Sequence, residues 1–153
     1  MPQTFYKLYY HIIWATKNRL PLIDLEIEKL IKRYIPNKIT EYSGKQLVLN
    51  MVEDHIHLLV SIPTKISIAD FVHKIKGSSS HYINALQGEK SFYWQSGYGI
   101  LSLSEKGIPF VKEYIDNQKQ KHQNNDLVYI LECIEDENGG QKETAQIHNR
   151  LGE

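Results

Sequence analysis

The stretch Leu47–Pro63, LVLNMVEDHIHLLVSIP, decides the fold of this chain. Two runs of apolar and β-branched residues, 47–52 and 55–62, lie on either side of the polar pair Glu53-Asp54. Such runs favour strands, and two strands joined by so short a polar link form an antiparallel hairpin, although the usual glycine is missing here. The sequence therefore predicts a tight β-hairpin in this stretch.

The two histidines of this hairpin are the first candidate site. Side chains alternate across a strand, so His55 and His57 should project side by side from one face of the sheet, while Ile56 and Leu58 face the core. Two neutral imidazoles at this spacing can bind a divalent metal ion. The same pattern also occurs as two half-exposed histidines without a metal, and the motif alone leaves both interpretations open.

The residues outside the hairpin predict the remaining elements. Phe5–Thr16, FYKLYYHIIWAT, has aromatic and β-branched residues on both parities, which is typical of a strand in the middle of a sheet. Asp24 should cap a helix that Pro36 ends. Further along, the sequence predicts a helix that begins at Ser67, a glycine-interrupted edge strand over 92–102, one long helix through about His122, and a short amphipathic turn over 127–134.

The order of these elements indicates the fold class. Strand, helix, strand, strand, helix, strand and helix is the ferredoxin-like (split βαβ) order. We therefore expect an α+β fold, an antiparallel sheet with helices on one face, plus a C-terminal helix. We expect one domain over residues 1–134 and a polar, acidic, flexible tail over 135–153.

Length and composition narrow the class of protein. With 153 residues, 41% hydrophobic and 24% charged, the chain can form one packed core. It has no apolar run of membrane-spanning length, and its start does not resemble a secretory leader. Cys133 is the single cysteine, which excludes a disulfide framework. We expect a cytoplasmic protein that is not in the membrane.

The net charge of the chain is zero, but its charges are unevenly distributed. Residues 1–125 hold 16 basic and 11 acidic side chains, whereas residues 126–153 hold 2 and 7. A basic body of this kind can follow a phosphate backbone, and the acidic end conceals it in the total. An ordinary solvated surface gives the same numbers, so charge alone leaves both interpretations open.

The last predicted helix carries the second candidate site. Tyr114 and Gln118 are four residues apart and should share one face of that helix. Alone, the pair is typical of a half-buried tyrosine beside a solvated glutamine. Together with the two strand histidines, it could surround a metal-bound phosphate.

Four segments, taken in this order, resemble a known family. VEDHIHLLVSIP, FVHKIKGSSSHYIN, FYWQSGYGILSLSE and VKEYIDNQKQKH are similar to the single-tyrosine HUH transposases of bacterial insertion sequences and their REP-associated relatives. The resemblance runs from about Tyr9 to His122, so the HUH single-tyrosine transposase domain would occupy 1–134. Gly107 and Pro109 depart from the family pattern at the start of the tyrosine helix.

The resemblance implies a transposase that is a metal-dependent single-strand DNA endonuclease and strand transferase. In this family the tyrosine is the nucleophile and forms a covalent 5′-phosphotyrosine intermediate, a role that falls to Tyr114. His55, His57 and Gln118 would hold Mg²⁺ or Mn²⁺. The implied partner is single-stranded DNA, in the form of the hairpin ends of an insertion sequence or repeat. A homodimer, in which active sites can be shared between subunits, is also implied.

Other polar residues are candidates for supporting roles. Glu53 or Asp54 could complete the metal shell or fix a histidine tautomer, and His11 is either a packed core residue or a neighbour of the metal. Tyr93, Trp94 and Tyr98 could stack on unpaired bases or pack in the core. Candidates for DNA contacts, each equally consistent with a solvated surface group, are Lys17, Arg19, Lys74, Lys76 and Ser78.

Two other functions are consistent with the same elements. One is a non-cleaving, ferredoxin-like module that binds single-stranded nucleic acid, or a domesticated relative of the transposases. The other is a replication initiator or relaxase with the same chemistry, although such proteins are usually longer. The presence of His55, His57, Tyr114 and Gln118 together favours the enzyme, because a binding module does not need them.

Overall fold

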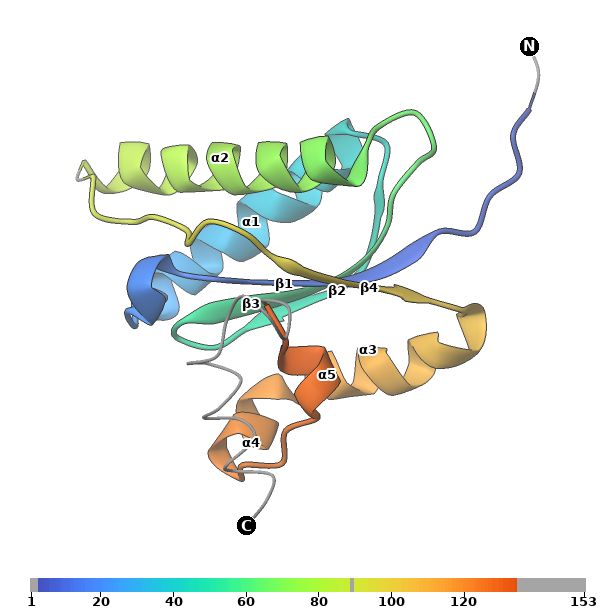
Figure 1. Cartoon of the computed structure of the whole chain (residues 1–153). Helices are drawn as coiled ribbons and strands as arrows, with labels where there is room; N and C mark the ends of the chain where they lie inside the picture. The colour runs from blue at the N-terminus through green and yellow to red at the C-terminus, as the bar shows by residue number, and fades with distance from the viewer. Residues whose placement is uncertain (1–2, 89, 135–153) are drawn as a thin grey trace.

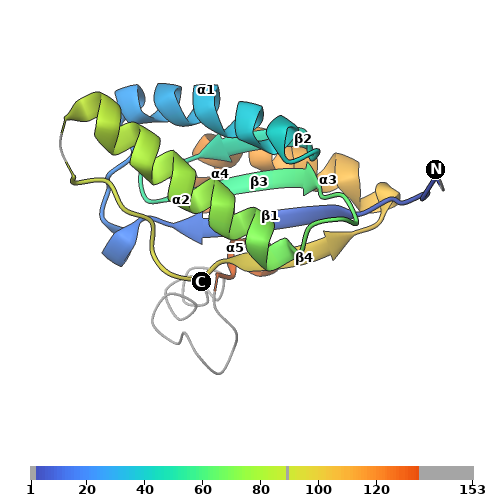
Figure 2. The same cartoon turned by 90° about the horizontal axis from the view of Figure 1, so that it is seen from above.

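One antiparallel sheet organises the molecule, as the computed structural model of residues 3–88 and 90–134 shows. The strand order is β2-β3-β1-β4, with α1 and α2 on one face and α3, α4 and α5 on the other (Figure 1). Seen from above, α1 and α2 lie side by side across the sheet (Figure 2). The α+β, ferredoxin-like prediction is confirmed. The strands are β1 (Tyr9–Ala15), β2 (Lys45–Met51), β3 (His55–Ser61) and β4 (Gly99–Leu103); the helices are α1 (Leu25–Glu41), α2 (Ile68–Gln87), α3 (Ile108–Asp116), α4 (Gln118–Gln123) and α5 (Tyr129–Glu132), with short 3-10 turns η1 (Lys17–Arg19) and η2 (Glu105–Gly107).

The two central strands carry the sequence patterns that predicted them. β1 lies between β3 and β4, as its two-sided apolar pattern indicated. β2 and β3 form the expected hairpin, which a hydrogen bond from the Val52 N–H to the His55 carbonyl closes over 3.1 Å. In the register of the sheet, His55 pairs with Ala15 and His57 with Ile13. Residues paired in this way face the same side, so the histidines share a face with alternate residues of β1.

Apolar packing covers both faces of the sheet. The larger cluster lies between the sheet and α1 and α2, and includes Ile56, Leu58 and Val60 of β3. The smaller cluster lies under α3 and α5, where Leu59 packs with Val111, Ile115 and their neighbours. His55 and His57 lie on the face of the smaller cluster, as the alternation of β3 predicted.

The expectation that Pro36 ends the first helix is wrong. Asp24 does cap α1, its Oδ1 accepting the Ile27 N–H over 2.8 Å, but the helix continues through Pro36 to Glu41. Ile35 and Ile39 are both fully buried on either side of the proline. Their packing offsets the hydrogen bond that a proline cannot donate.

The single long C-terminal helix that the sequence predicts is divided in two. Asn117, with φ −99° and ψ 18°, lies between α3 and α4. Asn50 of β2 donates from its side chain to the carbonyls of Ile115 and Asp116, over 2.9 and 3.3 Å. Asn50 thus occupies two carbonyls in the last turn of α3 with side-chain hydrogen bonds, and the helix ends there. Tyr114 and Gln118 therefore lie on consecutive helices.

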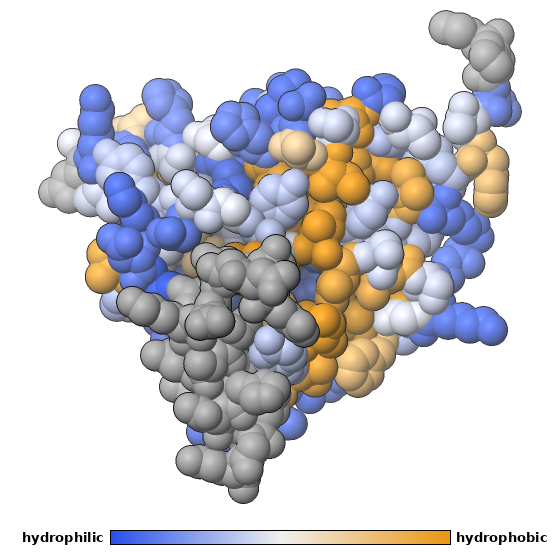
Figure 3. All heavy atoms as spheres, in the orientation of Figure 1, coloured by the Kyte–Doolittle hydropathy of each residue, from blue (hydrophilic) through white to orange (hydrophobic). Residues whose placement is uncertain are grey.

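The remaining sequence predictions concern the edges of the fold. The predicted edge strand over 92–102 is confirmed only from Gly99 onward, as β4, and 92–98 holds just an isolated bridge from Trp94 to Thr16. Apolar surface runs from α2 across the edge of β4 to α3 (Figure 3). The short amphipathic turn is α5. The expected tail over 135–153 lies outside the described residues. No helix in the described part of the chain is long and apolar enough to cross a membrane.

Candidate metal and nucleophile site

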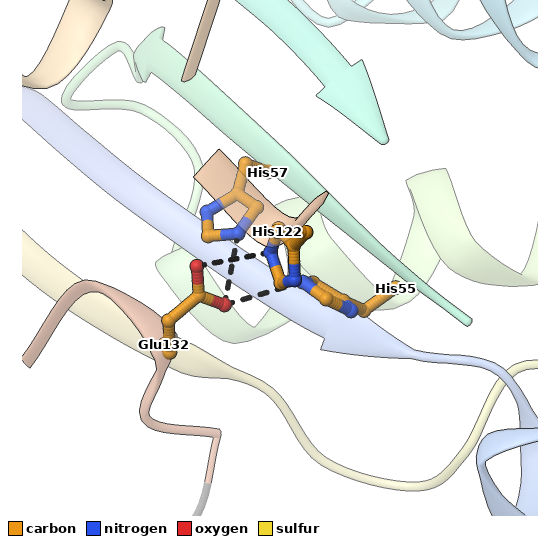
Figure 4. Close-up of side chains that lie close together, drawn as sticks. All are labelled: His55, His57, His122 and Glu132. Atoms are coloured by element: carbon orange, nitrogen blue, oxygen red, sulfur yellow. Dashed lines mark hydrogen bonds and ion pairs between the residues drawn. The ribbon is translucent and has the colours of Figure 1, made fainter. Parts of the chain in front are cut away.

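The two motif histidines meet a carboxylate that the sequence did not predict. His55 and His57 are 1% and 0% exposed, and the Nε2 atom of each lies 3.2 Å from Oε2 of Glu132 on α5. His122 on α4 lies on the other side of the same carboxylate, with its Nε2 atom 3.2 Å from Oε1. Figure 4 shows the three imidazoles around the Glu132 side chain. These four residues have ligand atoms within 4.8 Å of one another.

Tyr114 belongs to the same group of side chains. Its hydroxyl donates to Oε1 of Glu132 over 2.6 Å and accepts the Val128 N–H over 3.1 Å. Its ring centroid is 6.1 Å from that of His57, and only 1% of the residue is exposed. The structure thus brings the predicted nucleophile and two of the three predicted metal ligands, His55 and His57, together through Glu132.

Gln118, the third predicted ligand, is buried without a polar partner. The residue is 0% exposed, and neither Oε1 nor Nε2 has a hydrogen-bond partner among the described residues. The Nε2 atoms of His55 and His122, although close to Glu132, also lack hydrogen-bond geometry. Buried polar atoms are nearly always satisfied, because leaving one unpaired costs about 1–3 kcal/mol. Imidazole nitrogens and an amide oxygen in this condition fit a divalent cation.

A second set of contacts orients the histidines. Asp54 lies 2.7 Å from Nδ1 of His55, which leaves Nε2 directed at Glu132, and Arg19 lies 3.4 Å from the other Asp54 oxygen. His11 of β1 is buried and lies 2.7 Å from Nδ1 of His57. Such partners fix the ring tautomer and raise the basicity of a ligating imidazole. Asp54 therefore lies where one of the sequence interpretations put it, beside a histidine.

Burial and charge act on these groups in opposite directions. Burial lowers the pKa of His57, but at His55 the neighbouring Asp54 and Glu132 outweigh burial and raise the pKa. Burial also lowers the pKa of His11 to about 3. Burial alone would raise the pKa of Glu132, yet His57 and the other histidines hold it well below its usual range. The carboxylate is thus an anion among imidazoles.

Tyr114 is held in its protonated form. Burial raises the pKa of its hydroxyl above the ordinary value, and the charge of Glu132 raises it further. A phenolate next to a carboxylate in a dry environment is electrostatically unfavourable. The observed arrangement therefore favours the neutral phenol of Tyr114.

Close packing at the sheet edge brings Glu132 into the site. A Cβ atom on Gly99 of β4 would lie 1.9 Å from the carbonyl oxygen of Cys133, so only glycine allows the chain to pass there. Leu131 and Ile134 are buried on either side of this contact. The end of α5 is thereby seated on the sheet, and the functional side chains below it are closed off from solvent.

Three of the predicted DNA-contact residues lie apart from the side chains around Glu132. Lys74, Lys76 and Ser78 are on α2, across the sheet. The Lys76 ammonium donates to the carbonyls of Gln95 and Gly97, both over 2.7 Å, and the Ser78 hydroxyl donates to the Lys74 carbonyl. Their role in DNA binding stays a prediction.

The turn after β1 carries the other two predicted DNA contacts. Lys17 lies over the Tyr93 ring, 5.7 Å from its centroid, and Arg19 contacts Asp54. Asn18 and Arg19 adopt positive φ angles of 57° and 52°, which residues with a side chain rarely do. A role of Lys17 and Arg19 in DNA binding also stays a prediction.

Glu132 and His122 are the site residues that the sequence interpretation missed. His122 follows Gln118 by four residues, so the spacing Tyr114, Gln118, His122 could have revealed it as a third polar residue on one helical face. Glu132 lies among apolar residues in a short turn, next to Leu131, and no pattern distinguishes it from a surface acid. Only tertiary packing reveals its position.

Comparison of the sequence with known proteins identifies a family and several relatives. The family model for IS200-like transposases matches residues 4–118. The chain is 28% identical over 122 residues to the ISDra2 transposase TnpA of Deinococcus radiodurans, covering 76% of this chain and 87% of that protein. It is 27% identical over 119 residues to the transposase for insertion sequence element IS200 of Salmonella typhimurium, covering 73% and 77%.

Solved structures share the fold. A protein of Deinococcus radiodurans R1, solved as a candidate transposase, superposes with a TM-score of 0.62 at 28% identity, covering 77% of this chain and 95% of that one. A REP-associated tyrosine transposase bound to a REP hairpin superposes with a TM-score of 0.60 at 15% identity, covering 80% and 74%.

Proposed function

The chain belongs to the IS200-like transposase family, and we propose that it cleaves and rejoins single-stranded DNA through a covalent bond to Tyr114. Family membership makes it a DNA transposase, an enzyme that cuts and rejoins DNA. The observation that carries the finer proposal is the group of side chains around Glu132, whose carboxylate accepts a hydrogen bond from Tyr114 and lies 3.2 Å from both His55 and His57 in one chain. A module that only binds DNA does not need a phenol and a histidine pair to meet.

The chemistry assigned to Tyr114 is transesterification. Its Oη atom attacks phosphorus after losing its proton to solvent, and the bond from phosphorus to the 3′ oxygen breaks. The leaving oxygen takes up a proton and becomes a free 3′ hydroxyl, while the 5′ phosphate stays esterified to the tyrosine. A second 3′ hydroxyl can displace the tyrosine from this ester, so rejoining needs no ATP.

The residues present fit a divalent cation. His55, His57 and Gln118 would hold a Mg²⁺ or Mn²⁺ ion, which supplies Lewis acidity toward the scissile phosphate. Asp54 and His11 keep the two imidazoles in the tautomers and orientations that ligation requires. His122 and Glu132 offer further ligand atoms to the same centre.

A DNA strand can reach these groups only if α5 moves. Tyr114, His57 and Gln118 are each at most 1% exposed, and Glu132 occupies the space between the phenol and the imidazoles. A phosphate that Tyr114 attacks must contact both the phenol and the imidazoles. We therefore assign the observed arrangement to a resting form, in which the carboxylate stands where the phosphate would bind.

The proposed substrate is single-stranded DNA with hairpin ends. A REP-associated tyrosine transposase of the same fold is bound to a REP hairpin, which supports this choice for the present chain. A homodimer is also proposed, with a second copy covering the apolar β4 edge (Figure 3). Since Tyr114 and His57 of one chain already contact a common carboxylate, completion of the site within one chain is the simpler arrangement.

A cleavage assay with a matched control tests the proposal. The wild-type protein with Mn²⁺ and an end-labelled single-stranded hairpin should give a shortened labelled product, and a chelator should prevent it. His57→Ala should abolish cleavage, whereas His81→Ala, a change at an exposed histidine of α2, should leave it intact. Hairpin binding without cleavage by the wild-type protein would favour the alternative, a non-cleaving module for single-stranded nucleic acid.

A further inference from the structure

A pocket on the face opposite the nuclease site lies between two motifs that the proposed chemistry does not use. One wall is the α2 face that includes His73, Lys76 and Ser80, and the other is the segment 93–98. The cavity measures about 560 Å³. The sequence stretches KGSSS and WQSGYG, both part of the family resemblance, meet across it. Neither stretch supplies a side chain to the group around Glu132.

The walls of this pocket are firmly held. Lys76 ties α2 to the opposite segment through the carbonyls of Gln95 and Gly97. Trp94 is fixed by a hydrogen bond to Ser79 over 2.9 Å and by edge contacts with other aromatic rings. A pocket whose sides are joined in this way is formed before a ligand arrives.

Gly77 is unexplained by packing. Glycine inside a helix costs about 0.5–1 kcal/mol relative to alanine, and a Cβ atom here would meet nothing within 4 Å. The residue lines the pocket, so its missing side chain leaves the cavity open. Packing within the protein does not require a glycine at this position, so the space beside Gly77 is available to a ligand.

The chemistry of the lining selects a planar, uncharged and polar occupant. Tyr93 and Tyr98 offer aromatic surface, and Ser80 and His73 offer hydrogen-bonding groups. The one lysine has two of its three N–H groups on backbone carbonyls, and Asp70 adds a negative charge to the lining. Both features disfavour a phosphate. An unpaired nucleobase matches aromatic walls with polar edges.

A short series of backbone contacts connects the pocket to the proposed nuclease site. Thr16, at the end of β1, pairs with Trp94 of the pocket wall, and its N–H donates to the Asp54 carbonyl over 2.9 Å. Asp54 in turn contacts His55. A strand held at the pocket is therefore anchored at the end of the sheet where the metal ligands begin.

We propose that this pocket binds an unpaired base of the DNA substrate and so helps to select where the strand is cut. This assignment rests on the proposed function, because it takes single-stranded DNA as the substrate. The base stacks between the tyrosines of the segment 93–98 and the α2 face at Gly77. Stacking of one base contributes about 1–3 kcal/mol, enough to set a preference at one position of the strand.

The test fills the pocket with an apolar side chain from two neighbouring positions of α2. Gly77→Leu places a side chain in the cavity and Ser80→Leu does so from the next turn, while Ala85→Leu adds the same side chain at an exposed position of α2 outside the pocket and is the matched control. Gly77→Leu and Ser80→Leu should each bind a fluorescent single-stranded hairpin about tenfold more weakly than the wild type, whereas Ala85→Leu should bind as the wild type does. Unchanged binding in both Gly77→Leu and Ser80→Leu would overturn the assignment.

A second measurement separates a base from a phosphate and separates this inference from the proposed function. In a ¹H–¹⁵N spectrum, at least one deoxynucleoside monophosphate should shift the amides of Gly77 and Tyr98, and deoxyribose 5-phosphate should not. Equal shifts with the sugar phosphate, or none with any nucleotide, would reject a base pocket. If the wild type forms a covalent DNA adduct but no nucleotide shifts the amides of Gly77 and Tyr98, only this inference fails. If the pocket binds bases but no adduct forms, the proposed nuclease fails instead.

Discussion

The hydroxyl of Tyr114 donates to the carboxylate of Glu132 over 2.6 Å, and both side chains are buried. The same carboxylate lies 3.2 Å from the imidazoles of His55 and His57. One side chain of α5 therefore contacts both the proposed nucleophile and two of the proposed metal ligands. Burial and the charge of Glu132 raise the pKa of the Tyr114 hydroxyl, so the phenol stays protonated in this arrangement.

Removal of the Glu132 carboxylate should release the nucleophile. Hydrogen bonds to charged groups contribute about 1.5–3 kcal/mol, so Glu132→Ala should speed formation of a covalent DNA adduct by about tenfold or more. The measurement is a single-turnover time course with excess hairpin and Mn²⁺. Ile130→Ala, an exposed change on the same helix, is the control and should have no effect. A slower reaction together with weaker Mn²⁺ binding would show that Glu132 is a required ligand.

Gln118 should destabilise the metal-free protein and strengthen the binding of the metal ion. Its two buried amide atoms lack partners, so Gln118→Met should raise the free energy of unfolding of the metal-free protein by about 1–2 kcal/mol. The same change should reduce Mn²⁺ affinity. Urea denaturation with a chelator and Mn²⁺ titration measure the two effects. Gln120→Met, at an exposed position, should change neither; lower stability with unchanged Mn²⁺ affinity in Gln118→Met would refute the ligand role.

Asp54 should act on the metal through His55. Loss of an outer partner of a ligating histidine typically costs 10- to 100-fold in metal affinity, and we expect about that loss for Asp54→Asn. Electron paramagnetic resonance of free Mn²⁺ measures this without DNA. Glu53→Gln changes the charge by the same amount at an exposed neighbour and should leave the affinity unchanged. Equal losses in both variants would indicate a general charge effect.

The close approach at Gly99 should be needed to seat α5. A methyl group there would overlap the Cys133 carbonyl, so Gly99→Ala should lower the free energy of unfolding by about 1–3 kcal/mol and loosen α5. Gly107→Ala is the control, since its nearest neighbour is an ordinary 3.9 Å away. Thermal denaturation and hydrogen exchange at residues 127–134 follow the two changes. Unchanged hydrogen exchange at residues 127–134 in Gly99→Ala would show that Gly99 is not needed to close the site.

The alternation and order of the strands were predictable because they follow from local patterns. The hairpin around Glu53-Asp54, the two-sided strand at 9–15 and the shared face of His55 and His57 all follow from side-chain periodicity. The helix boundaries were less predictable. Packing of Ile35 and Ile39 carries α1 past Pro36, and a side-chain contact from Asn50 divides α3 from α4. Both effects are tertiary.

The site was predictable only where chemistry and periodicity coincide. The histidine pair has a spacing that a sheet converts into proximity, and Tyr114 meets it through Glu132, whereas the break at Asn117 places Gln118 on the next helix. Glu132 has no such spacing, since it reaches the site because Gly99 lets the chain after α5 approach the sheet. The family resemblance ended near His122, so it gave no indication of what covers the site.

The most direct test of the central claim is to map the covalent bond itself. The protein is incubated with Mn²⁺ and a single-stranded hairpin, then digested with protease and nuclease, and the peptides are analysed by mass spectrometry. The account predicts a nucleotide phosphoester on the peptide that contains Tyr114, absent in Tyr114→Phe although that variant still binds the hairpin. An adduct on another residue, or strand cleavage that persists in Tyr114→Phe, would contradict it.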